Sequence, residues 1–388
     1  MNIFDVLPVK NLENSVKLLE KCKEECKKLK EMYHSETRLE FIKKLKKLRP
    51  EILSTLHYYC LQFKEDFSII LLDIIKTEFY DKFKGRVTLT YGDVAESHAG
   101  MQNIGEKAER GFSLNDIKRA ESFFKSKGCE TIIIHLNDFL PEGDDASLKN
   151  AKTKEEFQAY LFIARKGLNC LIDDDKGVEL TTETQFFEWD AKLYNSRRKI
   201  VQNKNARHNL NFSNQKQQSD FENGKGTTIP WEEVPLIYKT RKALRYAFGD
   251  SAKDLQCEGN LYYEGKQKTG IGYHGDSERR KVIGIRLGGK PMNIHYQWYH
   301  RSRPVSVNIS TTLEPGDIYC MSQKTVGTDW KSSSVYTLRH AAGADMYTTN
   351  TTNIKVSNIR DSSIYEGVKI GDTMYKEKPK KSKNEDSD

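Results

Sequence analysis

The stretch GNLYYEGKQKTGIGYHGDSE, residues 259–278, decides the predicted fold of this chain. Its outer parts, GNLYYEG and TGIGYHGD, are strand candidates, and the glycine and lysine residues between them are typical of a turn. Residues i and i+2 of a strand face the same side, so His274 and Asp276 project together. Such a pair belongs either to a metal site or to a charged surface turn, and the two residues alone do not separate these alternatives.

A third ligand would separate them. Two imidazoles and one carboxylate form the facial triad of non-haem Fe(II) oxygenases, which leaves coordination positions open for a cosubstrate and oxygen. His340, in the segment SVYTLRHAAG, supplies a second imidazole 64 residues after Asp276. The intervening LEPGDIYCMS predicts a turn at its GD dipeptide and then a strand. His295 and His300 are poorer candidates, because they follow Asp276 by only 19 and 24 residues.

Strand-like segments recur at short spacing from residue 229 to about residue 360. They are GNLYYEG, TGIGYHGD, KVIGIRLG, MNIHYQWYH, VSVNISTT, DIYCMSQ, SVYTLRHAA and NIKVSNI. Many short strands separated by turns are typical of a β-sandwich or a jelly roll. The fold class is therefore predicted as α+β, with a C-terminal double-stranded β-helix (jelly-roll) core.

The N-terminal half of the chain has a different character. Residues 1–82 form a basic region that is predicted to be helical, with Pro50 at the start of a helix or at a break. Residues 83–184 are predicted to be a small α/β unit, with strands in GRVTLTYGD and ETIIIHLNDFL. Between these strands, SLNDIKRAESFFKSKG predicts a helix with a serine N-cap that ends at Gly128. We find no motif that assigns a role to either region.

Two polar stretches set the limits of the C-terminal domain. Residues 195–230 are rich in Asn, Lys and Gln, so they are expected to contribute little core and to form a functional loop or a boundary. Residues 366–388 are charged and are predicted to be disordered. The jelly-roll domain is accordingly placed at residues 185–365.

Composition limits the class of protein. The 388 residues carry a formal charge of +8, which permits an anionic partner without requiring one. No apolar run reaches about 18 residues, so no membrane partner is expected. The seven cysteines are odd in number and irregularly spaced, which favours reduced thiols over a zinc site or a disulfide framework. An intracellular location, cytoplasmic or nuclear, is expected, and nothing in the sequence indicates an oligomeric state.

The stretch of residues 259–278 resembles the AlkB family of 2-oxoglutarate- and Fe(II)-dependent dioxygenases. Members of that family have an Asn-x-Tyr strand, a glycine-containing turn and an H-x-D strand. Asn260 and Tyr262 match the first pattern, and His274 and Asp276 match the second. KVIGIRLG, LEPGDIYCMS and the earlier IPWEEVPLIYKTRKAL are similar to further segments of the family. The resemblance covers residues 185–365 and is closest to AlkB-like proteins of large DNA viruses.

The C-terminal part departs from the family pattern. Family members place the second histidine soon after the GD aspartate, where this chain has none, and continue with an R-x-N-x-T-x-R strand. Two alignments remain. In the first, His340 is the iron ligand, and Lys355 or Arg360 binds 2-oxoglutarate. In the second, Arg339 binds 2-oxoglutarate and Asp329 replaces the histidine. We prefer the first, because a second imidazole suits Fe(II) better than a second carboxylate.

The resemblance implies Fe(II) as the metal, with 2-oxoglutarate and O₂ as cosubstrates, and it implies that Asn260 and Tyr262 hydrogen-bond 2-oxoglutarate. The implied activity is that of an oxidoreductase that hydroxylates or oxidatively demethylates a nucleobase in DNA or RNA, as in DNA repair. A base must leave its stack to reach buried iron, so cations and aromatic side chains are expected at the site. The candidates are Arg279, Arg280, Trp298 and Tyr299.

Two other functions stay open from the sequence. Some relatives of the AlkB family oxidise protein, so a protein side chain or a small molecule is an alternative substrate. The second alternative is a catalytically inactive nucleic-acid-binding protein whose lysine-rich helices hold the nucleic acid. The aromatic hairpin around Trp298 also has a purely structural interpretation, as a β surface with cross-strand aromatic pairs.

Overall fold

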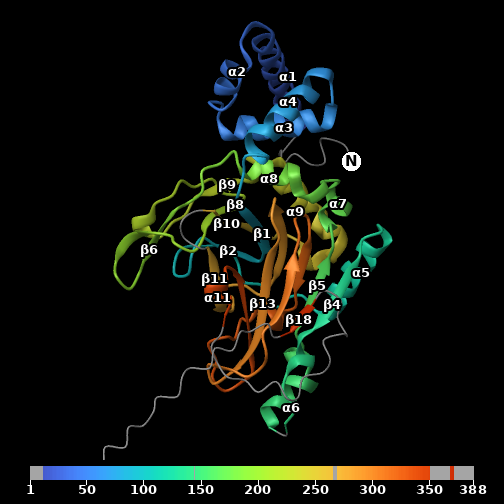
Figure 1. The fold of residues 1–388 in the computed structure, drawn as a ribbon, viewed down its shortest axis with the longest axis vertical. Coiled ribbons are helices and arrows are strands. Elements are labelled where there is room, and N and C mark those ends of the chain that lie inside the picture. Colours follow the sequence, from blue (N-terminus) through green and yellow to red (C-terminus); the bar gives the residue numbers. More distant parts are fainter. Residues whose placement is uncertain (1–11, 144, 265–268, 350–367, 371–388) are drawn as a thin grey trace, which may run out of the picture.

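The structure is a computed structural model that describes residues 12–143, 145–264, 269–349 and 368–370. It is a mixed α+β fold in which a helical region lies at one end of two large β-sheets, as Figure 1 shows. The α+β class expected from the sequence is therefore confirmed. Lys355, Arg360 and most of the predicted C-terminal tail lie outside the described residues.

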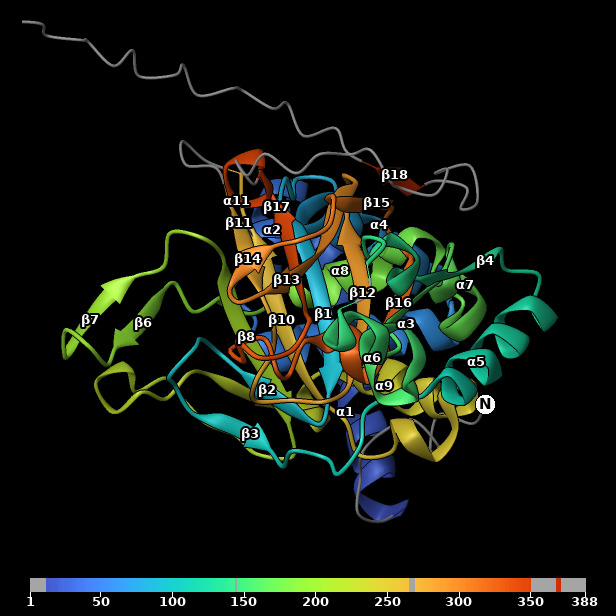
Figure 2. The same cartoon turned by 90° about the horizontal axis from the view of Figure 1, so that it is seen from below.

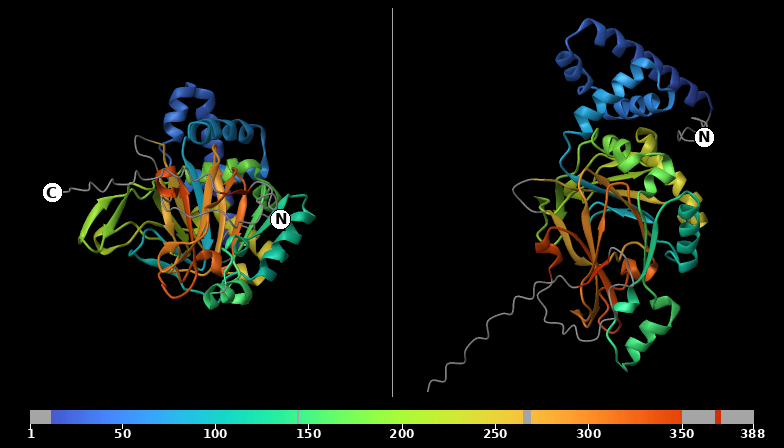
Figure 3. Two further views of the ribbon diagram at one scale, coloured as in Figure 1. Left: turned by 60° about the horizontal axis from the view of Figure 1, so that its bottom comes forward. Right: turned by 45° about the vertical axis from the view of Figure 1, so that its right-hand side comes forward.

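The helical region comprises α1 (Leu12–Ser35), α2 (Arg38–Leu45), α3 (Pro50–Phe63) and α4 (Asp66–Ile75), followed by a π-helical turn at Lys76–Tyr80. Pro50 occupies the first turn of α3, as its sequence position predicts, since its fixed φ and missing N–H suit that position. Buried side chains from all four helices form a separate core. Figure 3 shows these helices stacked on one end of the sheets.

Two buried polar contacts join the helical region to the rest of the molecule. The Ser54 hydroxyl on α3 donates a hydrogen bond to the Glu183 carboxylate at 2.8 Å, and His57 Nε2 lies 2.7 Å from Glu179 Oε2. Both glutamates belong to α8 (Val178–Thr184). Glu183 is fully buried and also accepts the backbone N–H groups of Leu236 and Ile237, so one carboxylate ties three segments together.

The larger sheet has eight strands, and each neighbouring pair is antiparallel except the last. In spatial order they are β4 (Thr131–His135), β5 (Tyr160–Ala164), β16 (Ile318–Met321), β12 (Val282–Gly288), β1 (Arg86–Gly92), β10 (Gln256–Tyr262), β8 (His208–Ser213) and β9 (Thr228–Pro230). Strand β1 lies between β10 and β12, and its Thr88 is paired with Asn260 on one side and Arg286 on the other.

This order corrects the domain boundary expected at residue 184. Strands β1, β4 and β5 come from the predicted α/β unit of residues 83–184, yet they share one sheet with strands of the predicted C-terminal domain. The polar stretch of residues 195–230 contains strand β8, whose Leu210 and Phe212 are fully buried. The asparagines of this strand led to the wrong expectation, because Asn209 and Asn211 are buried too, and their amide nitrogens donate to Asn260 and Ser97 within the protein.

The second sheet has the order β11 (Gly270–His274), β17 (Thr337–Gly343), β13 (Met292–His300), β15 (Ile309–Leu313) and β18 (Val368–Ile370), with β14 (Arg303–Pro304) paired to β13. All of these pairs are antiparallel. The two sheets face each other, since Tyr296 and Trp298 of β13 pack in one core with Val282 and Met321 of the larger sheet. The space between the sheets is where the candidate site lies.

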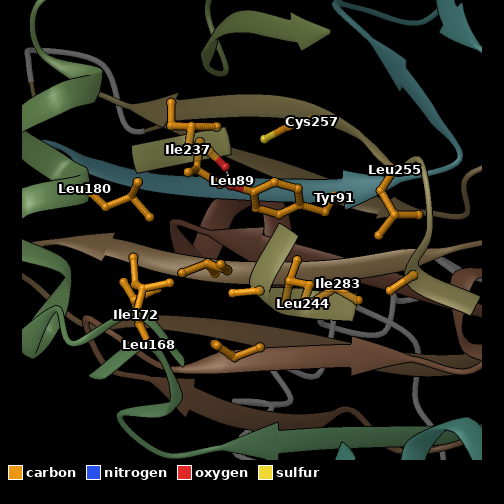
Figure 4. Close-up of a cluster of buried hydrophobic side chains, with 14 of the residues drawn as sticks. Leu89, Tyr91, Leu168, Ile172, Leu180, Ile237, Leu244, Leu255, Cys257 and Ile283 are labelled. Carbon is orange, nitrogen blue, oxygen red and sulfur yellow. Dashed lines mark hydrogen bonds between the residues drawn. The ribbon is translucent and has the colours of Figure 1, made fainter. Parts of the chain in front are cut away.

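Helices cover the outer face of the larger sheet. They are α5 (Leu114–Ser126), α7 (Gly167–Ile172), α8 and α9 (Pro235–Phe248), and their apolar side chains pack on alternate residues of the strands. Figure 4 shows Leu89 and Tyr91 of β1 in this layer, beside Ile237 and Leu244 of α9. Helix α5 begins with a capping box at Ser113, which confirms the predicted serine cap.

Smaller elements complete the fold. They are α6 (Ala146–Thr153), α10 (Gln323–Val326), α11 (Asp345–Thr348), the hairpin of β2 (Val94–Glu96) and β3 (Asn103–Gly105), and the hairpin of β6 (Lys192–Asn195) and β7 (Ile200–Asn203). Figure 2 shows the β6–β7 hairpin projecting from one side of the sheets. Within the described ranges, every helix is too short or too polar to cross a lipid bilayer.

One expectation about the cysteines is wrong. Cys129 and Cys170 form a disulfide, with Cα atoms 6.8 Å apart, where reduced thiols were expected. They are 41 residues apart in sequence and become neighbours only because α7 packs beside the end of α5. The other five cysteines are free and buried.

Candidate metal centre

Three side chains that the sequence predicts as ligands meet between the sheets. His274 ends β11, and its partner across the strand pair is His340 of β17. Asp276 follows in the loop after β11, where its backbone N–H donates to the Val326 carbonyl at 3.0 Å. One ligand atom from each of the three residues lies within 4.8 Å of the others, and no further group of this kind occurs among the described residues.

The two imidazoles converge on one carboxylate oxygen. His274 Nε2 lies 3.4 Å from Asp276 Oδ1, and His340 Nε2 lies 3.7 Å from the same atom. The two rings are tilted against each other, with centroids 4.4 Å apart. Two nitrogens and one oxygen around a common point are the donor set of a two-histidine, one-carboxylate site for a divalent metal.

The hydrogen bonding of His274 and the protonation of His340 suit metal binding. His274 Nδ1 donates to the Gly272 carbonyl at 2.8 Å, so the lone pair of Nε2 faces the site. Burial, followed by the neighbouring His274, lowers the pKa of His340 to about 3, so this ring is neutral at physiological pH. Neutral imidazole is the form that coordinates metal.

Asp276 is held ionised by an arginine behind it. Burial alone would raise the pKa of the Asp276 carboxyl, but Arg279, His274 and His340 outweigh burial and lower it well below its usual range. Arg279 Nε lies 3.4 Å from Oδ2, and the other side of the guanidinium donates to Glu258 at 2.6 Å. Arg279 therefore orients one carboxylate oxygen and leaves Oδ1 beside the histidines.

The sequence H-G-D needs its central glycine. A Cβ on Gly275 would lie 2.1 Å from the carbonyl oxygen of Gly327 and 2.8 Å from Trp330 Cβ. Only glycine allows this close approach of two backbones, and the approach brings Asp276 next to Val326. The local fold of the loop therefore depends on Gly275.

The three ligands line a cavity of about 80 Å³ between the two sheets. Asn260 and Tyr262, which the resemblance assigns to the cosubstrate, line the same cavity. The Asn260 side-chain oxygen accepts hydrogen bonds from Arg207 at 2.5 Å and Asn209 at 2.8 Å. Apolar side chains close the cavity on the side of the smaller sheet, namely Ile271, Met292, Ile294, Leu313 and Ala342.

Two aromatic candidates do not reach the cavity. Trp298 is fully buried and donates to the Leu136 carbonyl at 2.8 Å. Tyr299 is 5% exposed, with the Arg339 guanidinium 4.1 Å from its ring centroid. Both rings are buried, so neither is a platform for a base. This corrects the prediction that Trp298 and Tyr299 contact the substrate.

The structure also corrects the second alignment of the C-terminal part. Arg339 lies next to His340 on β17, and neighbouring residues of a strand face opposite sides, so it stacks on Tyr299 and Trp330 outside the cavity. Asp329 accepts a hydrogen bond from Lys324 at 2.7 Å and is not part of the ligand cluster. His340 is the residue that joins the other two ligands.

The two arginines after the metal loop differ in their positions. Arg279 lines the cavity, but its contacts are to carboxylates behind the site. Arg280 donates to the Glu109 carbonyl, and its backbone N–H donates to Asp93 at 3.0 Å. Arg280 thus holds the neighbouring loop and does not line the cavity, in contrast to its predicted role at the substrate.

Sequence reasoning missed several residues of the cavity. Thr88 and Thr90 of β1, Arg207 before β8 and Glu258 of β10 all line it. A signal for the first two was present, because RVTLTYG alternates threonine with apolar residues and so predicts one polar face. The long separation of β1 from residues 259–278 prevented its placement beside the metal strand.

A cluster of unsatisfied donors lies deeper on the same face of the larger sheet. Arg286 of β12 is fully buried, donates to backbone carbonyls including that of Val87 at 2.8 Å, and has no carboxylate partner among the described residues. Arg286 Nε, Arg86 Nε and the Thr88 hydroxyl are buried without a hydrogen-bond partner in the described chain. Burial, and then the nearby Arg86, lower the pKa of Arg286 to about 9.

Comparison with known proteins gives a viral relative. The chain is 38% identical over 266 residues to a protein of Acanthamoeba polyphaga mimivirus named "Uncharacterized protein R156". The matched region is 69% of this chain and 98% of the relative. No protein-family model matches the chain, and no solved structure is significantly similar to it. The name of the relative records no activity, so the argument about function rests on the site.

Proposed function

This chain belongs to the family of the mimivirus protein R156, and from its His-Asp-His cluster we propose that it is an Fe(II)- and 2-oxoglutarate-dependent dioxygenase of the AlkB type. The observation that carries the proposal is the convergence of His274, Asp276 and His340 in a cavity between the two sheets. Surface clusters of acidic and imidazole groups are common without a metal. Here a buried neutral imidazole, His340, and the partly buried His274 converge on an ionised carboxylate, and this donor set fits Fe(II).

The strand order supports a double-stranded β-helix, in which two four-stranded sheets face each other. Strands β11, β17, β13 and β15 supply one sheet, and β10, β1, β12 and β16 the other. Strand β1 precedes the rest of this core in sequence. Its residues Arg86, Thr88 and Thr90 have the spacing of the first three positions in the R-x-N-x-T-x-R strand, which the C-terminal part lacks. We assign β1 to that role.

The unsatisfied donors below the metal cluster fit the distal carboxylate of 2-oxoglutarate. A fully buried guanidinium without a carboxylate is costly, and a bound anion would offset that cost. Arg286, Arg86 and Thr88 offer two cations and a hydroxyl on one face of the sheet. Tyr262 and Tyr319 line the cavity between them and the ligands, within electrostatic range of Arg286. Arg286, Arg86 and Thr88 are thus proposed to bind 2-oxoglutarate, in place of Lys355 and Arg339.

The chemistry divides between the metal and the protein. Bound Fe(II) together with 2-oxoglutarate supplies O₂-dependent oxidation of a C–H bond. The residues of this chain hold the metal through His274, Asp276 and His340, keep the Asp276 carboxylate ionised through Arg279, and anchor 2-oxoglutarate at Arg286. Apolar side chains of the smaller sheet line one wall of the cavity beside the metal cluster. An N-methyl group hydroxylated there would be lost as formaldehyde.

A nucleobase is the substrate that the mouth of the cavity supports best. Arg207 provides a donor at the cavity wall for the acceptors on the edge of a base, whereas Glu258 is already engaged by Arg279 and Asn209. The adjoining β6–β7 hairpin ends in exposed Arg197, Arg198 and Lys199, which match a phosphate backbone. The apolar wall could also contact a methylated protein side chain. The positive charge of the β6–β7 hairpin favours a nucleic acid over a protein substrate.

The proposal is tested by turnover. Purified protein with Fe(II), ascorbate and 2-oxoglutarate should form succinate, and N-methylated oligonucleotides should release formaldehyde and the unmodified base. His274→Ala should abolish both products. His300→Ala, which removes a histidine stacked on Tyr336 outside the cavity, is the matched control and should keep them. Absence of succinate with every substrate, or equal turnover by His274→Ala, would refute the proposal.

A further inference from the structure

A second concave surface lies on the helical side of the larger sheet. It is a groove of about 510 Å³ formed by α5, α9, the 3₁₀ turn η8 (Gly249–Ala252) and the two residues that follow this turn. Figures 1 and 2 show α5 beside α9 on this flank of the molecule. The lining side chains used below are Arg119, Arg241, Lys242, Arg245, Tyr246 and Lys253. We call this surface the α5–α9 groove.

The groove carries an excess of positive charge. Five basic side chains line it against two carboxylates, Asp250 and Asp254. Asp250 pairs with Arg245 at 2.6 Å, but the two side chains are 83% and 54% exposed, so water and salt screen the pair. Arg119 forms no ion pair with any described residue, and a Cβ at Gly249 would lie 3.1 Å from its Nε. The charge therefore favours an anionic ligand.

An aromatic side chain stands among these cations. Tyr246 is 63% exposed on the outer face of α9, an unusual position for a large ring. About two turns earlier on α9, Tyr238 lies beside the Lys242 ammonium, which is 5.5 Å from the centre of its ring. Exposed rings interleaved with cations form the surface on which single-stranded nucleic acid stacks its bases and places its phosphates.

A line of basic side chains connects the groove with the metal loop. Lys107 donates to the carbonyl of Ser277, the residue after the metal ligand Asp276, at 2.6 Å. Lys281 and Arg110 both donate to Ser251 in η8, at 2.8 Å and 3.2 Å. Lys107 and Arg110, three residues apart, therefore contact the loop that carries Asp276 and the η8 turn at the groove, respectively.

We propose that the α5–α9 groove binds a single-stranded segment of nucleic acid, with phosphates at Arg119 and Arg245 and a base on Tyr246. The site extends the proposed function by holding the strand that flanks the nucleotide in the cavity. It does not depend on the metal, and binding can be measured without turnover.

The test uses the full chain without added metal or 2-oxoglutarate. Fluorescence anisotropy measures binding of a labelled oligothymidylate of about 12 nucleotides, within the range of known single-strand sites. The variant Arg119→Ala/Arg245→Ala/Tyr246→Ala should bind about tenfold to hundredfold more weakly. The slope of log affinity against log salt should fall by about 1.4, from about 0.7 for each lost phosphate contact.

The matched control changes two exposed lysines of α6 and an exposed ring of α3, as Lys149→Ala/Lys152→Ala/Phe63→Ala. It should bind like the wild type, as should His274→Ala. Equal binding by the groove variant and the wild type would overturn the inference, and so would an equal loss in the control. Competition by polyglutamate as strong as that by unlabelled oligonucleotide would overturn nucleic acid as the occupant. Wild-type protein that binds the oligonucleotide in the groove but forms no succinate would count against the proposed dioxygenase alone.

Discussion

Replacement of Arg286 by methionine separates a ligand-binding role from a structural one. The lowering of the pKa of Arg286 to about 9 corresponds to about 5 kcal/mol of unfavourable burial of the charge and repulsion by Arg86. Methionine fills similar volume without that charge, but it leaves three backbone carbonyls without their donor, at about 1 kcal/mol each. We expect Arg286→Met to raise the free energy of unfolding by about 2 kcal/mol.

The same substitution should weaken the binding of 2-oxoglutarate. A hydrogen bond to a charged group contributes about 1.5–3 kcal/mol, which corresponds to a loss of about 10- to 150-fold in affinity. Calorimetric titration of 2-oxoglutarate into the Mn²⁺-loaded protein measures this affinity without turnover, and urea unfolding measures stability. A more stable protein that binds its cosubstrate poorly is the expected combination.

Arg165→Met is the matched control, because Arg165 pairs with the fully buried Asp317 at 2.6 Å. Loss of that partner leaves a buried carboxylate and should cost about 3 kcal/mol of stability, with 2-oxoglutarate affinity unchanged. The reasoning about Arg286 fails if Arg286→Met is destabilised like Arg165→Met and binds 2-oxoglutarate like the wild type.

Three further predictions concern other parts of the structure. Gly275→Ala should weaken Mn²⁺ binding at least about tenfold in calorimetry, because the added Cβ displaces the loop that carries Asp276. Unchanged Mn²⁺ affinity would contradict the close approach of Gly275 to Gly327. Glu183→Gln should lower the free energy of unfolding in urea by about 2–3 kcal/mol, because the new amide nitrogen would face a backbone N–H that now donates to the carboxylate. A smaller loss than in the control Glu179→Gln would contradict this. Burial lowers the pKa of Lys204 to about 8, so the unfolded chain binds more protons between pH 8 and 10.5. The contribution of Lys204 to the free energy of unfolding should therefore rise by about 3 kcal/mol over that interval. If the difference in unfolding free energy between wild type and Lys204→Met stays constant with pH, this prediction is wrong.

The ligand set was accessible from the sequence because it depends on local geometry. His274 and Asp276 share a short segment, and alternation along a strand is a local rule. His340 was chosen by chemistry, since an imidazole suits Fe(II), and the register of β11 with β17 places it directly opposite His274. The glycine of H-G-D, in contrast, gave no hint of the contact with Gly327, because that contact joins segments about 50 residues apart.

The failures have a common physical origin in long-range pairing. The sequence of β1 predicted a strand, and the strand is present, but nothing local indicates that it lies between β10 and β12. Trp298 and Tyr299 were predicted at the substrate because aromatic and basic residues alternate around them. Whether such a face is open depends on what covers it, which is a property of tertiary packing and not of the strand itself.

The position of β1 has a consequence for the synthesis and folding of the protein. Arg86 pairs with Tyr262, so β1 leaves the ribosome about 10 to 30 seconds before its first neighbour, at ordinary rates of about 5–20 residues per second. Throughout that interval both edges of β1 lack the neighbours that they later pair with, and an unpaired apolar strand is prone to aggregate. Contacts of such high sequence separation also form slowly. A fragment that begins at residue 185 would therefore lack the middle of its own sheet, and the whole chain should depend on chaperones during translation more than its size suggests.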